Sequence, residues 1–438
     1  MRNSGIKYFR FFRIPIFLFL FFTFSTCHRK PTEPVYTNKI DFEFTNVYCS
    51  EVWISISKYE EGEKLIEIRR DDRTIYKFNF DGRDTVIINK WLKPNTVYKY
   101  SFYYSGLLIS IKQIKTLDTT SHEFEWSVHE FQSPFELGYL YDVAVIDENN
   151  IWAVGEIYSD SSKKWEPYNI FHWNGTEWEK KKVYRNGWIA KINWIFAFSD
   201  KDIWFGPFIH WNGHEFEEVP YDSSVFWQAR DIEGWGFSSV DMYVVGYHYG
   251  DGKGFIAHWN GSRWQRIESG LSGFSFTAIW GDINRKTGER EILCVGSGYA
   301  NATIIVKISR SGIERINMEG IKEGELYDVW FKAGKCYYVV GASPWGGYQL
   351  YYIEDINSKN LIWKSGSFYN SLFAVRGNDF NDVFMFGFEK THFNGYTWRD
   401  YRDRFNYGYF FGIDVKGDLV CAVGRTGGRG IALIGKRK

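Results

Sequence analysis

A histidine, an aromatic residue and Asn-Gly occur together four times in this chain, and histidine is a residue that binds metals and transfers protons. The four copies read FHWNG, IHWNG, AHWNG and THFNG, and their histidines are His172, His210, His258 and His392. Four histidines form a metal site only where they converge. We instead expect one repeated structural position, because repeats arranged around a ring hold equivalent residues apart.

The residues near these histidines are typical of turns. Asn-Gly predicts a two-residue hairpin turn in which both residues take positive φ. Acids such as Asp202, Asp241 and Asp382 recur just before an expected strand. We interpret them as turn residues that bond nearby backbone N–H groups. The glycine-rich stretch at 424–430 joins two expected strands and opens no helix, which argues against a phosphate site.

Sequence motifs of established catalytic machinery are absent. The chain contains no GxSxG elbow, no Walker sequence, no HExxH and no EF-hand loop. We therefore predict no catalytic residue, no metal ligand and no cofactor. An enzyme such as a glycoside hydrolase or lyase stays the least favoured of three alternatives, because it needs paired, unrepeated carboxylates near a channel.

The elements that position these motifs are strands in a repeat. Seven apolar stretches end in glycine at intervals of 37 to 51 residues, which is the length of one four-stranded blade of a β-propeller. We expect each repeat to hold a first strand, this glycine-ended second strand, a third strand ending at HWN and a fourth strand after the turn. The terminal glycines are Gly155, Gly206, Gly246, Gly296, Gly341, Gly387 and Gly424.

The last repeat ends at Lys438 without a fourth strand, which would leave an exposed edge. The stretch HEFEWSVHEF at 122–131 has the alternation of a strand and precedes the first repeat. We expect it to complete the last blade. Residues 121–438 therefore predict a seven-bladed β-propeller closed by an N-terminal strand, with six or eight blades as the alternatives.

Residues 38–118 predict a separate small β-sandwich of about seven short strands. The stretch WLKPNTVYKYSFYYSG resembles a fibronectin type III domain through Leu92, Pro94, Thr96, Tyr98 and Tyr100. That resemblance implies a tyrosine at the corner of the sandwich and implies no ligand. With 20% aromatic residues and only 9 prolines, the whole chain is expected to be all-β.

The propeller repeats resemble the Trp-rich, Asn-Gly-turn repeats of exported bacterial propellers and, more distantly, the BNR repeats of sialidases. They lack the Asp-box pattern of the sialidases, because HWNG occupies the turn and no Asp lies two residues before its glycine. The resemblance therefore implies a fold and does not imply sialidase chemistry.

The amino-terminal segment predicts export. Arginines up to Arg13 precede the 13-residue apolar run IPIFLFLFFTFST, which is too short to span a bilayer. Cys27 follows at once, and the segment resembles a bacterial lipoprotein signal, although Phe24, Ser25 and Thr26 depart from the usual residues. That resemblance implies a signal peptide at 1–26, lipidation of Cys27, a tether at 27–37 and a place in the bacterial cell envelope, facing the periplasm or at the surface. An uncleaved anchor and ordinary secretion are the alternatives.

The charge of the chain argues against nucleic acid as a partner. Residues 1–26 hold four basic residues and no acid, so the rest has 53 − 4 = 49 basic against 53 acidic residues. This balance gives no overall basic field for nucleic acid.

Cys294 and Cys421 lie in apolar strand-like runs and are expected to be small buried hydrophobic residues.

Binding is expected on loops that vary in length, which are the loops between second and third strands and the connections between repeats. These loops are rich in aromatic residues, which anchor protein partners or stack on sugars. We favour a protein partner, with a glycan as the second alternative. The candidate residues are Tyr158, Trp165, Tyr168, Trp188, Trp227, Tyr247, Tyr249, Tyr299, Trp345, Tyr348 and Tyr407.

Overall fold

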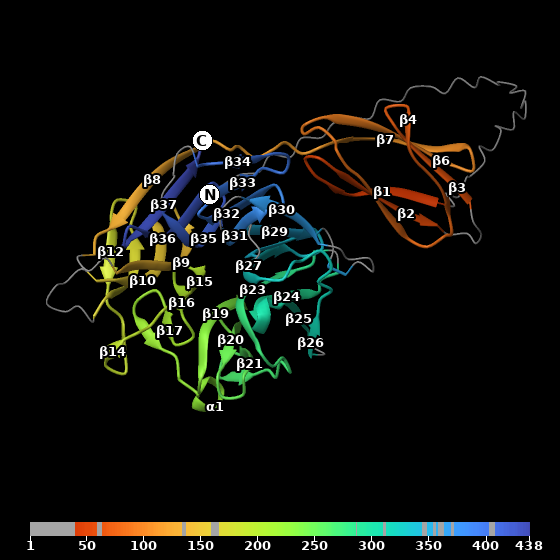
Figure 1. Cartoon of the computed structure of the whole chain (residues 1–438). Coiled ribbons are helices and arrows are strands. Elements are labelled where there is room, and N and C mark those ends of the chain that lie inside the picture. The colour runs from red at the N-terminus through yellow and green to blue at the C-terminus, as the bar shows by residue number, and fades with distance from the viewer. Residues whose placement is uncertain are drawn as a thin grey trace, which may run out of the picture.

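The computed structural model describes residues 40–58, 64–133, 137–158, 166–285, 287–309, 312–343, 348–353, 356–357, 363–368, 372–402 and 408–438. The predicted signal peptide, the tether and Cys27 lie outside these ranges. Within them the chain is all-β, and its strands form a ring of sheets beside a smaller body of two sheets (Figure 1). None of the described helices is long and apolar enough to span a membrane.

The smaller body lies within residues 40–115 and consists of a three-stranded and a four-stranded sheet. Its core contains Ile54, Ile68 and Phe102, all fully buried. One sheet has the order β1 (Ile40–Val47), β2 (Val52–Lys58), β5 (Thr85–Asn89). The other has the order β4 (Arg73–Phe80), β3 (Lys64–Arg70), β6 (Val97–Tyr104), β7 (Leu107–Lys115).

The ring is built from seven four-stranded sheets among the described residues from 124 to 437. We number them ring sheets 1 to 7 in chain order. Ring sheet 1 holds β9 (Gly138–Asp147), β10 (Asn150–Ile157), β11 (Tyr168–Trp173) and β12 (Trp178–Lys181). Ring sheet 2 holds β15 (Ile195–Ser199), β16 (Asp202–Phe205), β17 (Ile209–Trp211) and β18 (Phe216–Glu218). Ring sheet 3 holds β19 (Ala229–Ser238), β20 (Asp241–His248), β21 (Lys253–Trp259) and β22 (Trp264–Arg266).

The next three sheets repeat this arrangement. Ring sheet 4 holds β23 (Phe274–Ile283), β24 (Arg290–Gly298), β25 (Thr303–Ser309) and β26 (Gly312–Arg315). Ring sheet 5 holds β27 (Glu325–Lys332), β28 (Cys336–Ala342), β29 (Tyr348–Ile353) and β30 (Lys364–Phe368). Ring sheet 6 holds β31 (Leu372–Asp379), β32 (Asp382–Gly387), β33 (Lys390–Phe393) and β34 (Trp398–Asp400).

Ring sheet 7 closes the ring with both ends of the domain. It has the order β35 (Tyr409–Lys416), β36 (Leu419–Thr426), β37 (Arg429–Arg437), β8 (Phe124–Phe131). The predicted pairing is present, because β8 runs antiparallel to β37 from Phe124 opposite Arg437 to Phe131 opposite Gly430. The first strand of each ring sheet contacts the first strand of the next, and β35 contacts β9. The central axis of the ring is therefore lined by first strands.

A close approach of backbone explains five of the seven strand-ending glycines, namely Gly155, Gly246, Gly296, Gly341 and Gly424, whereas Gly206 takes positive φ and meets no such contact. The first strand bulges opposite the end of the second, for example where Gly155 lies opposite Leu140. A Cβ at Gly155 would overlap the carbonyl oxygen of Tyr139, and one at Gly424 would overlap that of Tyr409. Only glycine fits such a position without moving the neighbouring strand.

The repeated histidines are structural in the described ring. Each histidine donates its Nε2–H to the side-chain oxygen of the first residue of the second strand, and these residues are Asn150 (3.0 Å), Asp202 (2.8 Å), Asp241 (2.7 Å) and Asp382 (2.8 Å). The imidazole of each histidine also packs against an aromatic side chain of the second strand. The ring centroids of His258 and Tyr243, for example, lie 4.4 Å apart. The interpretation of these acids as turn residues bonding backbone N–H groups was therefore wrong, because their carboxylates bond the histidine of the third strand.

The Asn-Gly turn also differs from the prediction. Trp173 pairs with Trp178, so the loop contains four residues, and of Asn174 and Gly175 only the glycine has positive φ. The Asn174 side chain accepts hydrogen bonds from the N–H groups of Thr176 and Glu177, each at 3.0 Å. These bonds stabilise the four-residue loop, so Asn174 does not need the positive φ that a two-residue turn would require.

The seam between ring sheets 6 and 7 contains two histidines in contact. His122 Nδ1 lies 2.8 Å from His392 Nδ1, and His122 Nε2 lies 3.0 Å from the Thr397 hydroxyl. Asp382 accepts from His392 Nε2–H, so His392 Nδ1 is left to accept from His122. Burial, and then the neighbouring His392, lower the pKa of His122 to about 4, and burial lowers the pKa of His392.

This seam predicts a loss of stability in acid. Because the folded pKa of His122 is below its unfolded value, its contribution is complete above about pH 6.5 and is lost as the pH falls toward 4. We expect a cost of about 1–2 kcal/mol after allowance for solvent screening. Urea unfolding at pH 7.5 and 4.5 measures it, with His122→Asn as the comparison, since asparagine keeps a donor and does not titrate. Equal pH dependence of the two chains would contradict the assignment.

The two sides of the ring differ in their connections. We call the side with the first-to-second and third-to-fourth strand turns the turn face, and the opposite side the loop face. The smaller body contacts the turn face: Asn381 Nδ2 lies 3.8 Å from Cys49 Sγ, and the rings of Tyr48 and Phe380 lie 4.1 Å apart. The Ser50 hydroxyl also donates to the Gly395 carbonyl at 3.3 Å. The loop face therefore lies on the side away from this contact.

All four described cysteines are free and buried. Cys294 and Cys421 have no exposed surface, which confirms the prediction that they are small core residues. Cys49 lies at the contact between the two bodies, where it donates to the Asp118 carbonyl at 3.0 Å.

Candidate functional site

The loop face carries most of the exposed aromatic side chains of the ring. Among the described residues from 121 onward, nine Trp and Tyr side chains are exposed. Two of them, Tyr396 and Trp398, belong to the turn face. Seven belong to the loop face, and they are Tyr184, Trp188, Tyr221, Trp227, Tyr249, Tyr299 and Tyr409.

Three of the predicted residues are brought together by the fold. The rings of Tyr247 and Tyr249, at the end of β20, lie 4.8 Å apart. The Tyr299 hydroxyl, from the short helix η1 (Tyr299–Asn301) after β24, hydrogen-bonds to Tyr247 and raises its pKa. Tyr249 and Tyr299 are 63% and 78% exposed, so this cluster presents two aromatic faces to solvent.

The other predicted residues are dispersed. Trp188 is 80% exposed on β14 (Trp188–Ile189), and Trp227 is 66% exposed directly after α1 (Ser223–Phe226). Tyr158 and Tyr168 are half-buried in ring sheet 1, where the Tyr168 ring lies 5.2 Å from the Lys182 ammonium group. Trp165, Trp345, Tyr407 and the side chain of Tyr348 lie outside the described residues. Of the predicted binding residues, three therefore form one compact cluster, and the two exposed tryptophans lie apart from it.

A second feature of the loop face surrounds the predicted residue Trp188. The hairpin of β13 (Tyr184–Arg185) and β14 lies beside ring sheet 2. Together they border a cavity of about 340 Å³ that is lined by Trp188, Lys191 and Phe208 among others. The Arg185 guanidinium lies 4.2 Å from the Phe208 ring and 5.2 Å from the Tyr221 ring. This arrangement fixes a cation between aromatic side chains beside an exposed tryptophan.

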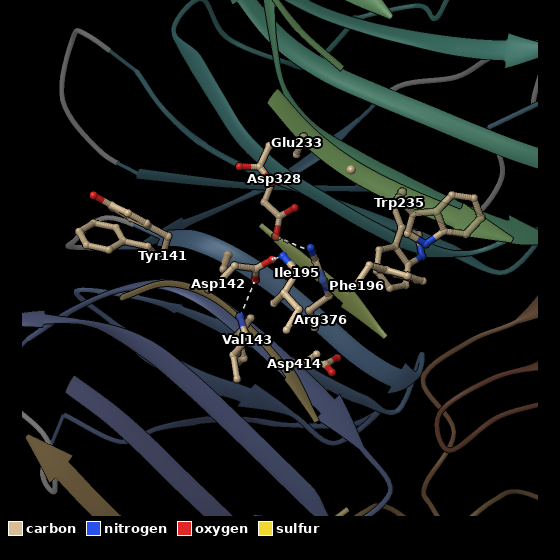
Figure 2. Close-up of a pocket in the computed structure, with 18 of the residues that line it drawn as sticks. Tyr141, Asp142, Val143, Ile195, Phe196, Glu233, Trp235, Asp328, Arg376 and Asp414 are labelled. Atoms are coloured by element: carbon tan, nitrogen blue, oxygen red, sulfur yellow. Dashed lines mark hydrogen bonds and ion pairs between the residues drawn. The ribbon is translucent and has the colours of Figure 1, made fainter. Parts of the chain in front are cut away.

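The axis of the ring holds a further cavity, of about 300 Å³, that sequence reasoning missed. Residues from the first strands of all seven ring sheets line it, and acidic side chains project into it (Figure 2). The signal in the sequence is charge within apolar first strands, as in LYDVAVI and LYDVWFK. The charged lining residues are Asp142, Glu233, Asp328, Arg376, Asp414 and Lys416.

Three of these acids connect neighbouring first strands. Asp142 accepts from the N–H of Ile195 at 3.0 Å, and Asp414 accepts from the N–H of Val145 at 2.7 Å. Asp328 accepts from the N–H of Val375 at 2.9 Å. First strands of adjacent sheets share no β-ladder, so these side chains satisfy backbone donors that would otherwise be buried without a partner.

The electrostatics of the channel favour neutral carboxyl groups. Burial raises the pKa of Asp142 to about 7, although two backbone N–H donors oppose that effect, and burial also raises the pKa of Asp414. Arg376 is a half-buried cation of the channel and lies 2.6 Å from Asp328. Burial raises the pKa of Glu233 well above its ordinary value, and the nearby Asp142 and Asp328 raise it further. The described residues contain no group of three or more His, Cys, Asp and Glu side chains suited to hold a metal ion.

Comparison with known proteins bears on the fold. No family model matches this chain, and no curated protein matches its sequence. The solved structure of YCF48 bound to D1 peptide has a TM-score of 0.50 and 14% identity, and the match covers 72% of this chain and 96% of that one.

Two other solved structures resemble the chain less. SapL1 lectin in complex with alpha methyl fucoside has a TM-score of 0.43 and 12% identity over 61% of this chain and 97% of that one. An auxiliary nutrient binding protein from Bacteroides ovatus has a TM-score of 0.37 and 10% identity over 91% and 99%. These neighbours are β-propeller-like, and the likeness to YCF48 shows that the ring of this chain has a fold of that kind.

Proposed function

We propose that this chain is an exported, non-enzymatic binding protein, anchored through a lipid on Cys27 in the bacterial cell envelope, whose loop face holds a protein partner. The observation that carries the proposal is the position of its exposed aromatic residues. Seven of the nine exposed Trp and Tyr side chains in the described ring lie on the face away from the smaller body. Large apolar groups on one face of a rigid ring are typical of an interaction surface.

In this proposal the ring is a seven-bladed β-propeller and the smaller body is a fibronectin type III domain. Seven four-stranded sheets closed by β8 support the first assignment. The second is supported by Tyr98, whose hydroxyl accepts from the N–H of Lys93 at 2.7 Å, as a corner tyrosine does. The domain gives the propeller distance from the membrane and leaves the loop face accessible.

A protein partner is favoured over a glycan by the spread of the exposed residues. Trp188, Trp227 and Tyr299 belong to ring sheets or connections well separated in the sequence, and a protein interface engages many such points at once. The likeness to YCF48, which is bound to a peptide in its solved structure, is compatible with this choice.

We expect the triple substitution Trp188→Ala, Trp227→Ala and Tyr299→Ala to weaken partner binding by at least about 30-fold, since exposed aromatic anchors carry most of the energy of an interface. The partner is captured from envelope extract by cross-linking to the parent chain, and its affinity for parent and variant is then measured by calorimetry.

The matched control is Trp91→Ala, because Trp91 is 92% exposed on the smaller body and away from the loop face. Unchanged affinity of the triple variant would reject the loop face as the binding surface. Loss of affinity in the Trp91 variant would place the surface on the smaller body. Binding of a polysaccharide in place of a protein would favour the glycan alternative.

A further inference from the structure

The central channel combines acidic groups in its depth with aromatic groups at one end. We propose that it binds an organic cation, an ammonium or guanidinium group that enters from the loop face and pairs with Glu233. This site is separate from the exposed loop-face aromatics and does not depend on the proposed protein partner.

The lining of the cavity is more acidic than basic. Its lining contains four acids and two basic residues. One basic residue, Lys416, lies at the far end of β35 and is exposed, whereas Arg376 is half-buried and paired with Asp328. Arg376 lies near both Asp142 and Asp414, and Lys416 is a second cation near Asp414. The channel thus holds more acid than its own cations neutralise, and a bound cation would lower the free energy of its charged form.

Independently of this charge balance, the carboxyl group of Glu233 has no partner among the described residues. Its carboxyl group lines the cavity and lies beside Asp328 (Figure 2). Glu233 is half-buried, and the protein around it raises its pKa. Among the described residues no hydrogen bond or ion pair to this carboxyl group is present, in contrast to Asp142, Asp328 and Asp414. A carboxyl group that lines a cavity without a hydrogen-bond or ion-pair partner can pair with a cation that enters the cavity.

The mouth of the cavity supplies a further argument. First strands all begin at the loop face, and aromatic residues stand near their starts. Tyr327 and Phe373 lie 5.3 Å apart, and Phe373 and Phe411 lie 5.8 Å apart, so three adjacent ring sheets form an aromatic arc. Tyr141 lines the same cavity from ring sheet 1. Aromatic faces attract organic cations and do not oppose the entry of an alkyl stem.

The chemistry of the ligand follows from these groups. A hard metal ion would need several converging oxygen ligands, and three of the acids are already engaged by backbone N–H groups. An ammonium or guanidinium group on an apolar stem needs one carboxylate and aromatic walls. Such a group comes from a free alkylamine or alkylguanidine, or from a lysine or arginine side chain of a protein.

The test measures binding of two matched pairs of probes to the purified full chain by calorimetry. Butylguanidinium is compared with the uncharged butylurea, and the peptide Gly-Arg-Gly with Gly-citrulline-Gly. We expect each charged probe to bind at least about 10-fold tighter than its neutral counterpart. Tighter binding of the peptide than of butylguanidinium would identify a protein side chain as the source, and the reverse would identify a free small molecule.

Glu233→Gln is the diagnostic variant. We expect it to reduce the affinity for the charged probes by at least about 10-fold and to leave the neutral probes unchanged. Without any probe, we expect the variant to melt at a higher temperature than the parent at pH 8, because it removes an unpartnered charge next to Asp142 and Asp328. A residue that only supported the fold would lower the melting temperature when changed. Glu314→Gln is the control, since Glu314 is exposed on the outer strand β26 and does not line the cavity.

The pH dependence gives a second measurement. The groups that face Glu233 are Asp142 on β9, Asp328 on β27, Arg376 on β31 and Asp231 on its own strand. Because binding of a guanidinium group requires Glu233 to lose its proton, affinity should increase between pH 6 and pH 8 in the parent and stay flat in Glu233→Gln. Absence of binding by both charged probes at about 10 mM, or equal affinity in parent and variant, would overturn the proposal.

Discussion

A chain that lacks residues 28–131 is expected to lose cooperative melting of the ring, whereas a chain that lacks only residues 28–118 keeps it. The two deletions differ by the closing strand β8, which pairs with β37 along its full length. Phe124 and Phe131 of this strand are 1% and 3% exposed and pack in two different core clusters. Truncating one buried phenylalanine costs about 3–5 kcal/mol, so losing both removes a large part of the usual stability of about 5–15 kcal/mol.

Calorimetric melting of both chains, beside the full chain, measures this effect. The shorter deletion is the control for loss of the smaller body and of its contact through Tyr48 and Cys49. Identical melting of the two deletions would show that the ring does not need β8. Such a result would also require another partner for the exposed edge of β37.

Asp328→Asn is expected to destabilise the ring by about 3–5 kcal/mol, which is the usual cost of leaving one member of a buried ion pair without the other. Asp328 is 5% exposed and accepts from both Arg376 and the N–H of Val375. Asparagine removes the negative charge and keeps one of the two oxygen acceptors, so either the N–H of Val329 or that of Val375 also loses its acceptor. The variant therefore measures the loss of the charge together with one backbone hydrogen bond.

The double variant Asp328→Asn with Arg376→Met provides the comparison. Because it removes both charges and keeps the volume of the arginine stem, we expect it to recover most of the lost stability. Urea unfolding at pH 7 of the parent, both single variants and the double variant gives the coupling energy. A coupling energy near zero would contradict the assignment of Arg376 as a half-buried cation that depends on Asp328.

The sequence by itself determined the repeating unit, because each of its signals is local. Most of the strand-ending glycines report a backbone contact one strand away, and the closing strand at 122–131 was evident from the missing fourth strand of the last repeat. The apolar strand that contains Cys421 was likewise correctly placed in the core. Periodicity and hairpin order are properties of neighbouring residues, so they are visible without the fold.

The local details of the repeat were predicted less well. The Asn174 turn and the role of Asp202 were both misjudged, since backbone N–H groups and a histidine compete for the same short polar side chains. Sequence spacing alone does not decide which donor such a side chain finds. The geometry of two adjacent strands decides it.

Only the tertiary structure decided which residues share a site. It gathered Tyr247, Tyr249 and Tyr299 from two ring sheets, and it left Trp188 and Trp227 apart. It also brought Glu233 and Asp328 into one channel, although they are about a hundred residues apart in the chain. The physical reason is closure: a ring places the first strand of every sheet at one axis, and this long-range contact leaves no periodic trace in the sequence.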